Sequence, residues 1–367
     1  MKVLIHLDSL GRGGAETQVL DICRNAARFG LDVTLVAAAG GALESEFAAT
    51  GVELIRLSRK FPVDLYMASQ LRRIIKDRGI DVVHGFQAVD GTHIYLAARG
   101  LAHVKKVLSF QGFVPDKKNR IALRILIPRM DLNVVVSEGL RRRLAEEHRL
   151  DTSRFEVLYN GADPARLKPT GRSIRGELGL AKDARLIGMI GNFYRVLSKD
   201  HLTLCRALPT AMKIFPELHC VFAGRIEPGA EGKMADCLNF CIENNIADRV
   251  HFLGSRSDVP DILSELEIFV FSSIREGFPV AVSEAMLAGV PMIVSNIAPL
   301  LEATANGKYA RVFPVRDHDA LSRAIVDLLS VDAERARLGN DAYEFAANNF
   351  SIDAHLERLT ELYQKLF

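Results

Sequence analysis

Short apolar runs alternate with longer amphipathic segments along the whole chain. In the first part of the sequence these runs cover residues 3–8, 33–38, 52–57, 81–86, 107–110, 132–137 and 155–160. Most of them are continuous and rich in Val, Ile and Leu, which is typical of strands buried on both faces. Helical periodicity separates most of the runs. The alternation predicts a parallel sheet with helices on both of its faces.

The same alternation begins again after a polar stretch at 163–171, which contains Pro and Gly and is typical of a linker. A second series of apolar runs covers 186–191, 218–224, 250–254, 268–273, 291–296 and 310–314. We therefore predict two doubly wound α/β domains in tandem, over 1–165 and 172–350. Residues 351–367 form a helical pattern of their own. Ligands of such sheets bind at the carboxyl ends of the strands.

Composition and charge agree with a globular protein of two domains. The chain has 367 residues, of which 49% are hydrophobic and 25% charged. The first 165 residues carry a net positive charge and the remainder a net negative one, an asymmetry that favours an anionic partner for the first domain but is too mild to predict nucleic-acid binding. No apolar stretch reaches the 18 residues or so of a spanning helix, and we find no signal peptide, so we expect a cytoplasmic protein.

Five cysteines are present, without a CxxC pair. An odd number of Cys favours free thiols in a reducing compartment. Cys237 and Cys241 are one helical turn apart and in principle suit a metal ion, but no other His or Cys pair completes such a site. We interpret both as packing residues.

The segment richest in chemistry begins at the end of the predicted strand 268–273 and continues into a short helix. Gly277 permits an unusual turn, Pro279 suits a helix start, and Gly289 suits its end. A strand followed by a tight loop and a helix start leaves backbone N–H groups free, which favours anionic or hydroxyl-rich ligands.

Two carboxylates mark this segment. Glu284 lies in the apolar helix and needs a partner, for which ribose hydroxyls are one candidate and solvent the other. Glu276 precedes the turn, and a helix over the whole span would separate the two by roughly 12 Å. Retaining glycosidases hold their two carboxyl groups only about 5 Å apart. The pair therefore suggests two contacts with a long ligand and not a hydrolytic pair.

The segment Glu276-Gly277-Phe278-Pro279, with Glu284 following after seven residues, closely resembles the signature of glycosyltransferase family 4. Shorter matching pieces, specific in this order, are the glycine-containing segment 11–16, the segment 160–163, the strand 250–254 and the Tyr-containing last helix. The resemblance implies the GT-B fold, in which two Rossmann-like domains face each other across a cleft. It also implies a retaining glycosyltransferase whose last helix returns to the first domain.

By the same resemblance, Glu284 holds the donor ribose. Glu276 and the backbone of Gly277, Phe278 and Pro279 hold the transferred sugar and a phosphate. The loop with Gly13 and Gly14 allows backbone to approach the donor diphosphate. A dinucleotide-binding loop is the rival interpretation, but the G-x-G-x-x-G pattern is not met and the second predicted strand lacks the acid that holds a nicotinamide ribose.

Cations are expected beside the leaving diphosphate. The family places an Arg after the first strand of the second domain and a Lys on the next helix start, and Lys199 matches the latter. Asn192 stands at the usual Arg position, and Arg195 is the candidate to replace it. Arg225 and Arg256, in two further loops, are expected to border the base. The alternative for each cation is an ordinary solvated charge.

The acceptor side departs further from the family pattern. Gln111 stands where a His is common, and it can orient a hydroxyl but cannot shuttle a proton. His84 matches a His that is frequent in the family, although a lone His at a strand end is more often structural. Retaining chemistry in the family is thought to need no strong enzymic nucleophile, since the donor phosphate can accept the proton.

No resident cofactor or metal is expected. Residues 317–319 form the only DxD pattern, which binds metal in another glycosyltransferase fold. Here it precedes a helix, and we predict Asp319 as the cap. By resemblance, GT-B enzymes need no tightly bound metal.

The stretch 105–129 combines seven basic residues with interleaved Ile and Leu, and only Asp116 opposes them. Such a segment suits the surface of an anionic membrane, as well as a solvated and partly packed helix.

We therefore predict a retaining glycosyltransferase that uses a UDP-sugar and a glycan or lipid-linked acceptor, with possible peripheral contact at the inner membrane face. The alternatives are another GT-B enzyme, such as a sugar-nucleotide epimerase, or a non-catalytic protein that binds sugar nucleotides.

Overall fold

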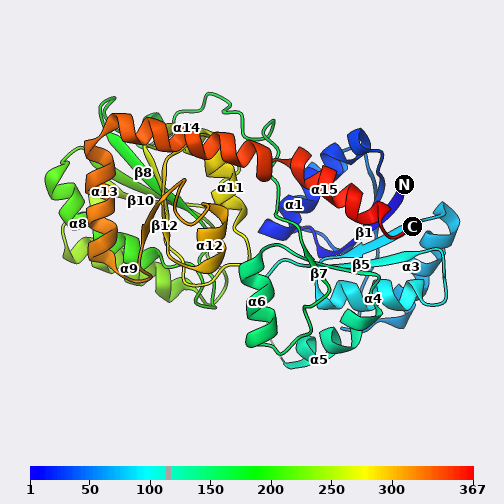
Figure 1. Cartoon of the computed structure of the whole chain (residues 1–367). Coiled ribbons are helices and arrows are strands. Elements are labelled where there is room, and N and C mark those ends of the chain that lie inside the picture. The colour runs from blue at the N-terminus through cyan, green and yellow to red at the C-terminus, as the bar shows by residue number, and fades with distance from the viewer. Residues whose placement is uncertain (113–116) are drawn as a thin grey trace. The chain divides into compact units, whose positions relative to one another are not determined.

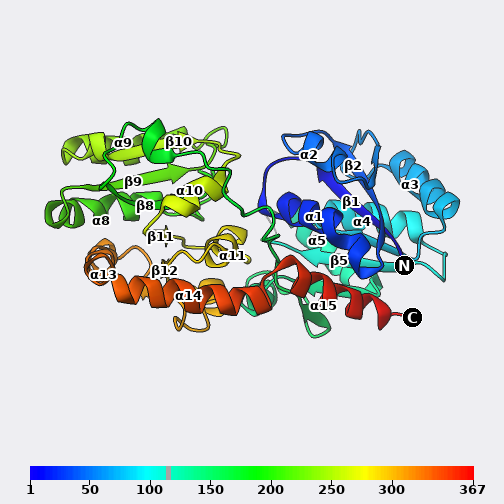
Figure 2. The same ribbon diagram turned by 90° about the horizontal axis from the view of Figure 1, so that it is seen from above.

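The structure of the chain is a computed structural model that describes residues 1–112 and 117–367. It contains two compact units. Met1–Gly161 together with Ile352–Phe367 form the first unit, and Ala162–Ser351 form the second. The chain thus passes between the units at Gly161 and again at Ser351. Each unit is built around one parallel sheet with helices on both faces (Figures 1 and 2).

The sheet of the first unit has seven strands in the order β3-β2-β1-β4-β5-β6-β7. In chain order these strands are β1 (Lys2–Ser9), β2 (Asp32–Ala39), β3 (Glu53–Arg56), β4 (Val82–Gly85), β5 (Lys105–Phe110), β6 (Leu132–Val135) and β7 (Phe155–Val157). The helices are α1 (Gly14–Asn25), α2 (Glu44–Ala48), α3 (Leu65–Arg78), α4 (Ala88–Ala98), α5 (Lys117–Leu126), α6 (Glu138–Glu146) and α15 (Ile352–Gln364). Short 3-10 turns occupy Ala26–Phe29 and Ile127–Arg129.

Two apolar layers cover this sheet. On one face, α1 and α15 pack side by side, and Leu356, Leu359 and Tyr363 of α15 enter the same core as Leu20 of α1 (Figure 1). On the other face, α3 and α4 supply Leu71, Ile75, Ile94 and neighbouring side chains. The helical spacing predicted for 352–367 is confirmed, because its apolar positions are those that α15 buries.

The sheet of the second unit has six strands in the order β10-β9-β8-β11-β12-β13. They are β8 (Arg185–Ile190), β9 (Leu218–Ala223), β10 (Val250–Gly254), β11 (Ile268–Phe271), β12 (Met292–Ser295) and β13 (Arg311–Phe313). The helices are α7 (Ile174–Glu177), α8 (His201–Ile214), α9 (Glu231–Glu243), α10 (Val259–Glu265), α11 (Val280–Leu287), α12 (Ala298–Ala303), α13 (His318–Ser330) and α14 (Asp332–Asn349), with a 3-10 turn at Ala247–Arg249.

The predicted fold class of two doubly wound domains is confirmed, and every predicted strand is present within a few residues of its expected bounds. Short polar side chains set several helix starts. Asp64, Ser137 and Asp200 each accept a backbone N–H of the first turn of the helix that follows. At α13 the cap is Asp317, which accepts the Ala320 N–H at 2.8 Å, so the prediction of Asp319 as the cap is wrong.

Each sheet has one point where the direction of winding reverses. In the second unit it lies between β8 and β11, and in the first unit between β1 and β4. Loops that leave neighbouring strands at such a point diverge to opposite faces, which opens a crevice at the carboxyl edge. The predicted site residues follow these strands, so they lie at the carboxyl edges of the two sheets.

Candidate functional site

The carboxyl ends of β8 and β11 bring the main predicted residues of the second unit together. Lys199 precedes α8, and Glu276 lies in the loop after β11. The Lys199 Nζ donates to Glu276 Oε1 at 2.9 Å, and the Ser273 Oγ lies 2.7 Å from the same oxygen. Both charged side chains are largely buried. A cation, a carboxylate and a hydroxyl therefore share one small polar cluster.

The position of Lys199 depends on a glycine. A Cβ built on Gly191, just after β8, would overlap Cδ of Lys199 and lie 2.8 Å from its Cε. The lysine stem thus crosses the bare Cα of Gly191 on its way to Glu276, and its ammonium lies 5.0 Å from the ring centre of Phe271. Any side chain at position 191 would displace the lysine.

Asn192 and Arg195 stabilise the loop that follows β8. The Asn192 Oδ1 accepts the backbone N–H of Arg225 at 2.9 Å, and the Arg195 N–H donates to Glu227 Oε2 at 2.7 Å. The side chains of Arg195 and Arg225 themselves are exposed. Lys233, which the sequence did not single out, donates to the carbonyl oxygen of Tyr194 at 2.6 Å and so also braces this loop. Asn192 acts here as a brace between two loops.

The short helix α11 carries the second predicted carboxylate. Glu284 is largely buried, and its Oε1 accepts the Nη2 of Arg166 at 2.7 Å. The predicted phosphate-binding backbone at Gly277, Phe278 and Pro279 leads directly into this helix. Pro279 has no N–H and can supply no donor there.

Arg256 lies in a separate ion-pair cluster. Its guanidinium is held by Asp258 and by Glu177 of α7, and these two carboxylates raise its pKa. Its donors are therefore largely engaged by the protein's own side chains. These contacts favour a structural role for Arg256 over the predicted contact with the base.

In the first unit, the glycine loop after β1 is tightly packed. Gly13 caps α1, and a Cβ built on it would lie 2.6 Å from Glu16 Oε2. A Cβ on Gly41 would overlap the backbone of Leu10, whose N–H donates to the Gly40 carbonyl at 3.3 Å. Gly14 begins the helix itself. The loop of Gly13 and Gly14 is thus backed by a second glycine pair, at positions 40 and 41, which the sequence did not single out.

His84 is enclosed within the first unit. Its Nδ1 lies 2.6 Å from the Tyr363 hydroxyl of α15, and its Nε2 lies 2.7 Å from Ser109 Oγ of β5. Burial lowers the pKa of His84 to about 3. An imidazole that stays neutral and has both nitrogens engaged joins α15 to the sheet. These contacts favour the structural interpretation of His84 over the catalytic one.

Gln111 and Asp90 lie beyond the carboxyl ends of β5 and β4. The Oε1 of Gln111 and both carboxyl oxygens of Asp90 are buried and make no hydrogen bond of ordinary geometry with described residues. Burial raises the pKa of Asp90 well above the usual aspartate value, and the charges of Asp8 and Glu16 reinforce the shift. The sequence did not single out Asp90, because an acidic residue in the first turn of a helix is common.

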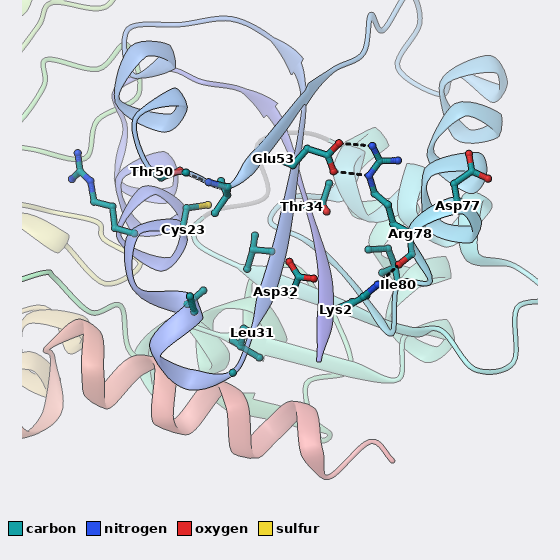
Figure 3. A pocket seen from close by; sticks show the side chains of 17 residues that line it. Lys2, Cys23, Leu31, Asp32, Thr34, Thr50, Glu53, Asp77, Arg78 and Ile80 are labelled. Atoms are coloured by element: carbon teal, nitrogen blue, oxygen red, sulfur yellow. Dashed lines mark hydrogen bonds and ion pairs between the residues drawn. The ribbon is translucent and has the colours of Figure 1, made fainter.

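One hollow of the described part of the structure lies at the other edge of the first sheet. It measures about 880 Å³ and is lined by the amino ends of β1, β2 and β3, with the Glu53–Arg78 ion pair on one wall (Figure 3). Its lining also includes the charged residues Lys2, Asp32 and Asp77. Ligands of doubly wound sheets bind at the opposite, carboxyl edge, so we do not assign a function to this hollow.

Neither metals nor cysteines add a site within the described residues. No group of three His, Cys, Asp or Glu side chains there is arranged to hold a metal ion. All five cysteines are free and buried, in agreement with the packing role predicted for Cys237 and Cys241. In the described part of the chain, no helix has the length and apolar character needed to cross a bilayer.

Comparison with known proteins identifies relatives along the whole chain. A model of Glycosyltransferase Family 4 matches residues 12–166, and a model of Glycosyl transferases group 1 matches residues 172–345. The UDP-Gal:alpha-D-GlcNAc-diphosphoundecaprenol alpha-1,3-galactosyltransferase of Escherichia coli is 24% identical over 316 residues, which cover 82% of this chain and 79% of the relative.

A second relative is the D-inositol 3-phosphate glycosyltransferase of Mycolicibacterium vanbaalenii, 25% identical over 303 residues that cover 75% of this chain and 66% of the relative. Among solved structures, that of Anabaena HepE in complex with UDP and glucose superposes with a TM-score of 0.85 at 18% identity, and covers 100% of both chains.

Proposed function

This chain belongs to the group 1 glycosyl transferases of the GT-B type, and we propose that it transfers a hexose from a UDP-sugar, with retention of configuration, to a glycan or lipid-linked acceptor. That it is a glycosyltransferase follows from the two family matches and the relatives. The donor, the stereochemistry and the acceptor are the proposed part.

One observation carries the donor assignment. Lys199 and Glu276 form a buried pair at the switch point of the second sheet, and the loop that holds Glu276 runs into α11, which bears Glu284. A diphosphate needs cations and backbone N–H groups, whereas a ribose needs a carboxylate. We assign Lys199 to the diphosphate, Glu276 to the transferred sugar and Glu284 to the ribose.

UDP is favoured by the relatives. The E. coli enzyme is named for UDP-Gal as its donor, and the Anabaena structure contains UDP. We extend this to the present chain, with Arg225 and Arg195 as exposed cations beside the donor.

The proposed transfer needs no protein nucleophile. The bond from the anomeric carbon to the leaving phosphate oxygen breaks, and the bond to the acceptor oxygen forms on the same face of the sugar. The acceptor proton passes to the leaving phosphate. Lys199 and the amides of Gly277 and Phe278 stabilise the charge that develops on the diphosphate. We propose that these groups replace a metal ion.

The acceptor is assigned to the first unit. Gln111 is the candidate to orient an acceptor hydroxyl, because its buried Oε1 makes no hydrogen bond with described residues. We also propose that α5 touches an anionic membrane: Ile121 and Ile125 are 48% and 51% exposed, and Lys117, Lys118 and Arg124 are exposed around them. Asp116, the opposing acid, lies outside the described residues.

A second apolar group strengthens the membrane proposal. Phe61, Val63, Leu65 and Tyr66, before and within the start of α3, are each 55–69% exposed. Both α3 and α5 follow strands of the same parallel sheet, and both pack against α4. Their amino ends therefore lie along one edge of the first unit.

Calorimetric titration tests the donor assignment. UDP and GDP, with NAD as control, are titrated into the wild type, into Glu284→Ala and into Glu243→Ala, which removes an exposed Glu of α9. We expect UDP to bind the wild type and Glu243→Ala equally, and Glu284→Ala roughly 10- to 100-fold more weakly. Preference for GDP would correct the donor, and binding that is unaffected by Glu284→Ala would contradict the proposed site.

A further inference from the structure

The turn that opens the second unit is held firmly in place. The Asp163 carboxylate accepts the Ala165 N–H at 2.8 Å, and the Asp163 carbonyl accepts the Arg166 N–H at 3.0 Å. Leu167 is buried, and the Ala162 N–H donates to the Phe350 carbonyl at 2.9 Å. The backbone at Arg166 therefore has a defined direction before its side chain makes any contact.

From this turn, Arg166 reaches the carboxylate of Glu284, which is 118 residues further along the chain. The Nη2–Oε1 distance is 2.7 Å, and the two side chains are only 20% and 9% exposed. A charge-assisted hydrogen bond of this length is among the stronger polar contacts in proteins, and its burial limits screening by salt. The contact is thus suited to hold Glu284 in one rotamer.

Only one of the two carboxylate oxygens is used in this contact. Oε2 of Glu284 makes no hydrogen bond with the described residues. A carboxylate can accept about four hydrogen bonds. Such a fixed and charged acceptor can bind a vicinal pair of hydroxyls without losing side-chain entropy on binding.

We propose that Arg166 is a positioning residue that holds the Glu284 carboxylate oriented for the ribose hydroxyls of a nucleoside diphosphate. The inference rests on the proposed function, since it takes Glu284 as the ribose contact. The competing explanation is that the pair merely ties the turn at 163–167 to α11. A structural tie supports every ligand of the unit alike, whereas a positioning role acts on the ribose hydroxyls alone.

The test therefore compares UDP with 2′,3′-dideoxy-UDP, which lacks both ribose hydroxyls. In calorimetry, the wild type should prefer UDP by roughly 10- to 100-fold, the range for hydrogen bonds to a charged group. Arg166→Met should reduce this ratio to within about threefold, mainly through weaker UDP binding. Arg166→Lys, which keeps the charge but not the planar fork, should give an intermediate ratio.

Arg172→Met is the matched control. Arg172 follows in the same connecting segment and pairs with a different carboxylate, Asp258, at 3.2 Å. Its replacement should leave the ratio at the wild-type value. Thermal melting of each variant reports on the fold. If Arg166→Met does not fold, the affinity ratio of Arg166→Lys tests the positioning role.

The outcomes separate the two proposals. A wild-type preference for UDP that survives in Arg166→Met and Arg166→Lys would overturn the positioning role and leave the proposed function intact. Equal losses of affinity for UDP and the dideoxy analogue would assign the pair a purely structural role. A wild type that binds neither nucleotide, or binds both equally, would overturn the ribose contact itself and this inference with it.

Discussion

Replacing Gly191 with alanine should disable the proposed diphosphate site without damaging the fold. A Cβ at this position would overlap Cδ of Lys199 and lie 2.8 Å from its Cε. Carbon atoms in contact prefer about 3.5–4.0 Å, so the lysine stem must move by roughly 1 Å. The nearest atoms to that Cβ all belong to the flexible side chain of Lys199, so the displacement is cheap for stability.

The same displacement is costly for binding. The Nζ–Oε1 distance to Glu276 is 2.9 Å, and a shift of about 1 Å takes it beyond the range of a hydrogen bond. If Lys199 holds the leaving diphosphate, its loss should cost about 1.5–3 kcal/mol, or roughly a 10- to 150-fold weaker affinity for UDP. Lys199→Met should lose a similar amount, and the two substitutions combined should lose little more than either alone.

Calorimetry with UDP measures this directly, and thermal melting checks the fold. Gly232→Ala, in α9, is the matched control, because a Cβ there meets no atom within 4 Å. It should bind UDP like the wild type. Wild-type affinity in Gly191→Ala, together with a large loss in Lys199→Met, would refute the steric reasoning. Wild-type affinity in both would show that Lys199 does not hold the diphosphate.

Three further predictions concern the first unit. Because burial lowers the pKa of His84 to about 3, the stability that this neutral ring contributes is complete above pH 6.5 and is lost as the pH falls toward 3. The decrease in unfolding free energy between pH 7 and pH 5 should therefore be about 2 kcal/mol smaller in His84→Gln than in the wild type. His103→Gln, which alters an exposed histidine, should show the same decrease as the wild type. The pKa of Asp90 is raised, so its burial costs stability increasingly as the pH rises above about 4. Asp90→Asn should therefore raise the melting temperature more at pH 8 than at pH 5. An equal rise at both pH values would contradict the raised pKa of Asp90. In sedimentation with vesicles that contain anionic lipid, the double variant Ile121→Ser and Ile125→Ser should bind less than the wild type, and equal binding would exclude α5 as the contact.

The strands, and the loops after them that carry the site residues, could be predicted from the sequence alone. Continuous apolar runs such as 268–271 have no polar face, so they identify strands that helices cover on both sides. Once these strands are placed, the loops after β8 and β11 must meet at one edge, and with them Lys199 and Glu276. The closeness of these two residues was not predicted from the sequence; it follows from the strand order, in which β8 and β11 are neighbours.

Other roles could not be predicted, because they depend on partners far away in the sequence. His84 matched a family position, yet its partner Tyr363 is 279 residues away and enters only through the packing of α15. Arg256 looked like a cation available to the base, but Glu177 and Asp258 engage it. Asp90 gave no signal at all, because burial cannot be recognised from its neighbours in the chain.

Local pattern thus determined the elements, the two sheets and the loops that carry the chemistry, since periodicity and turn residues act over a few positions. Tertiary structure decided which side chains meet. Gly191 matters because the stem of Lys199 crosses its Cα, and Glu284 is oriented because the turn at Arg166 lies beside α11. Both depend on the distances between segments that are remote in the chain, and these distances are set by strand register and by the packing of helices onto the sheet.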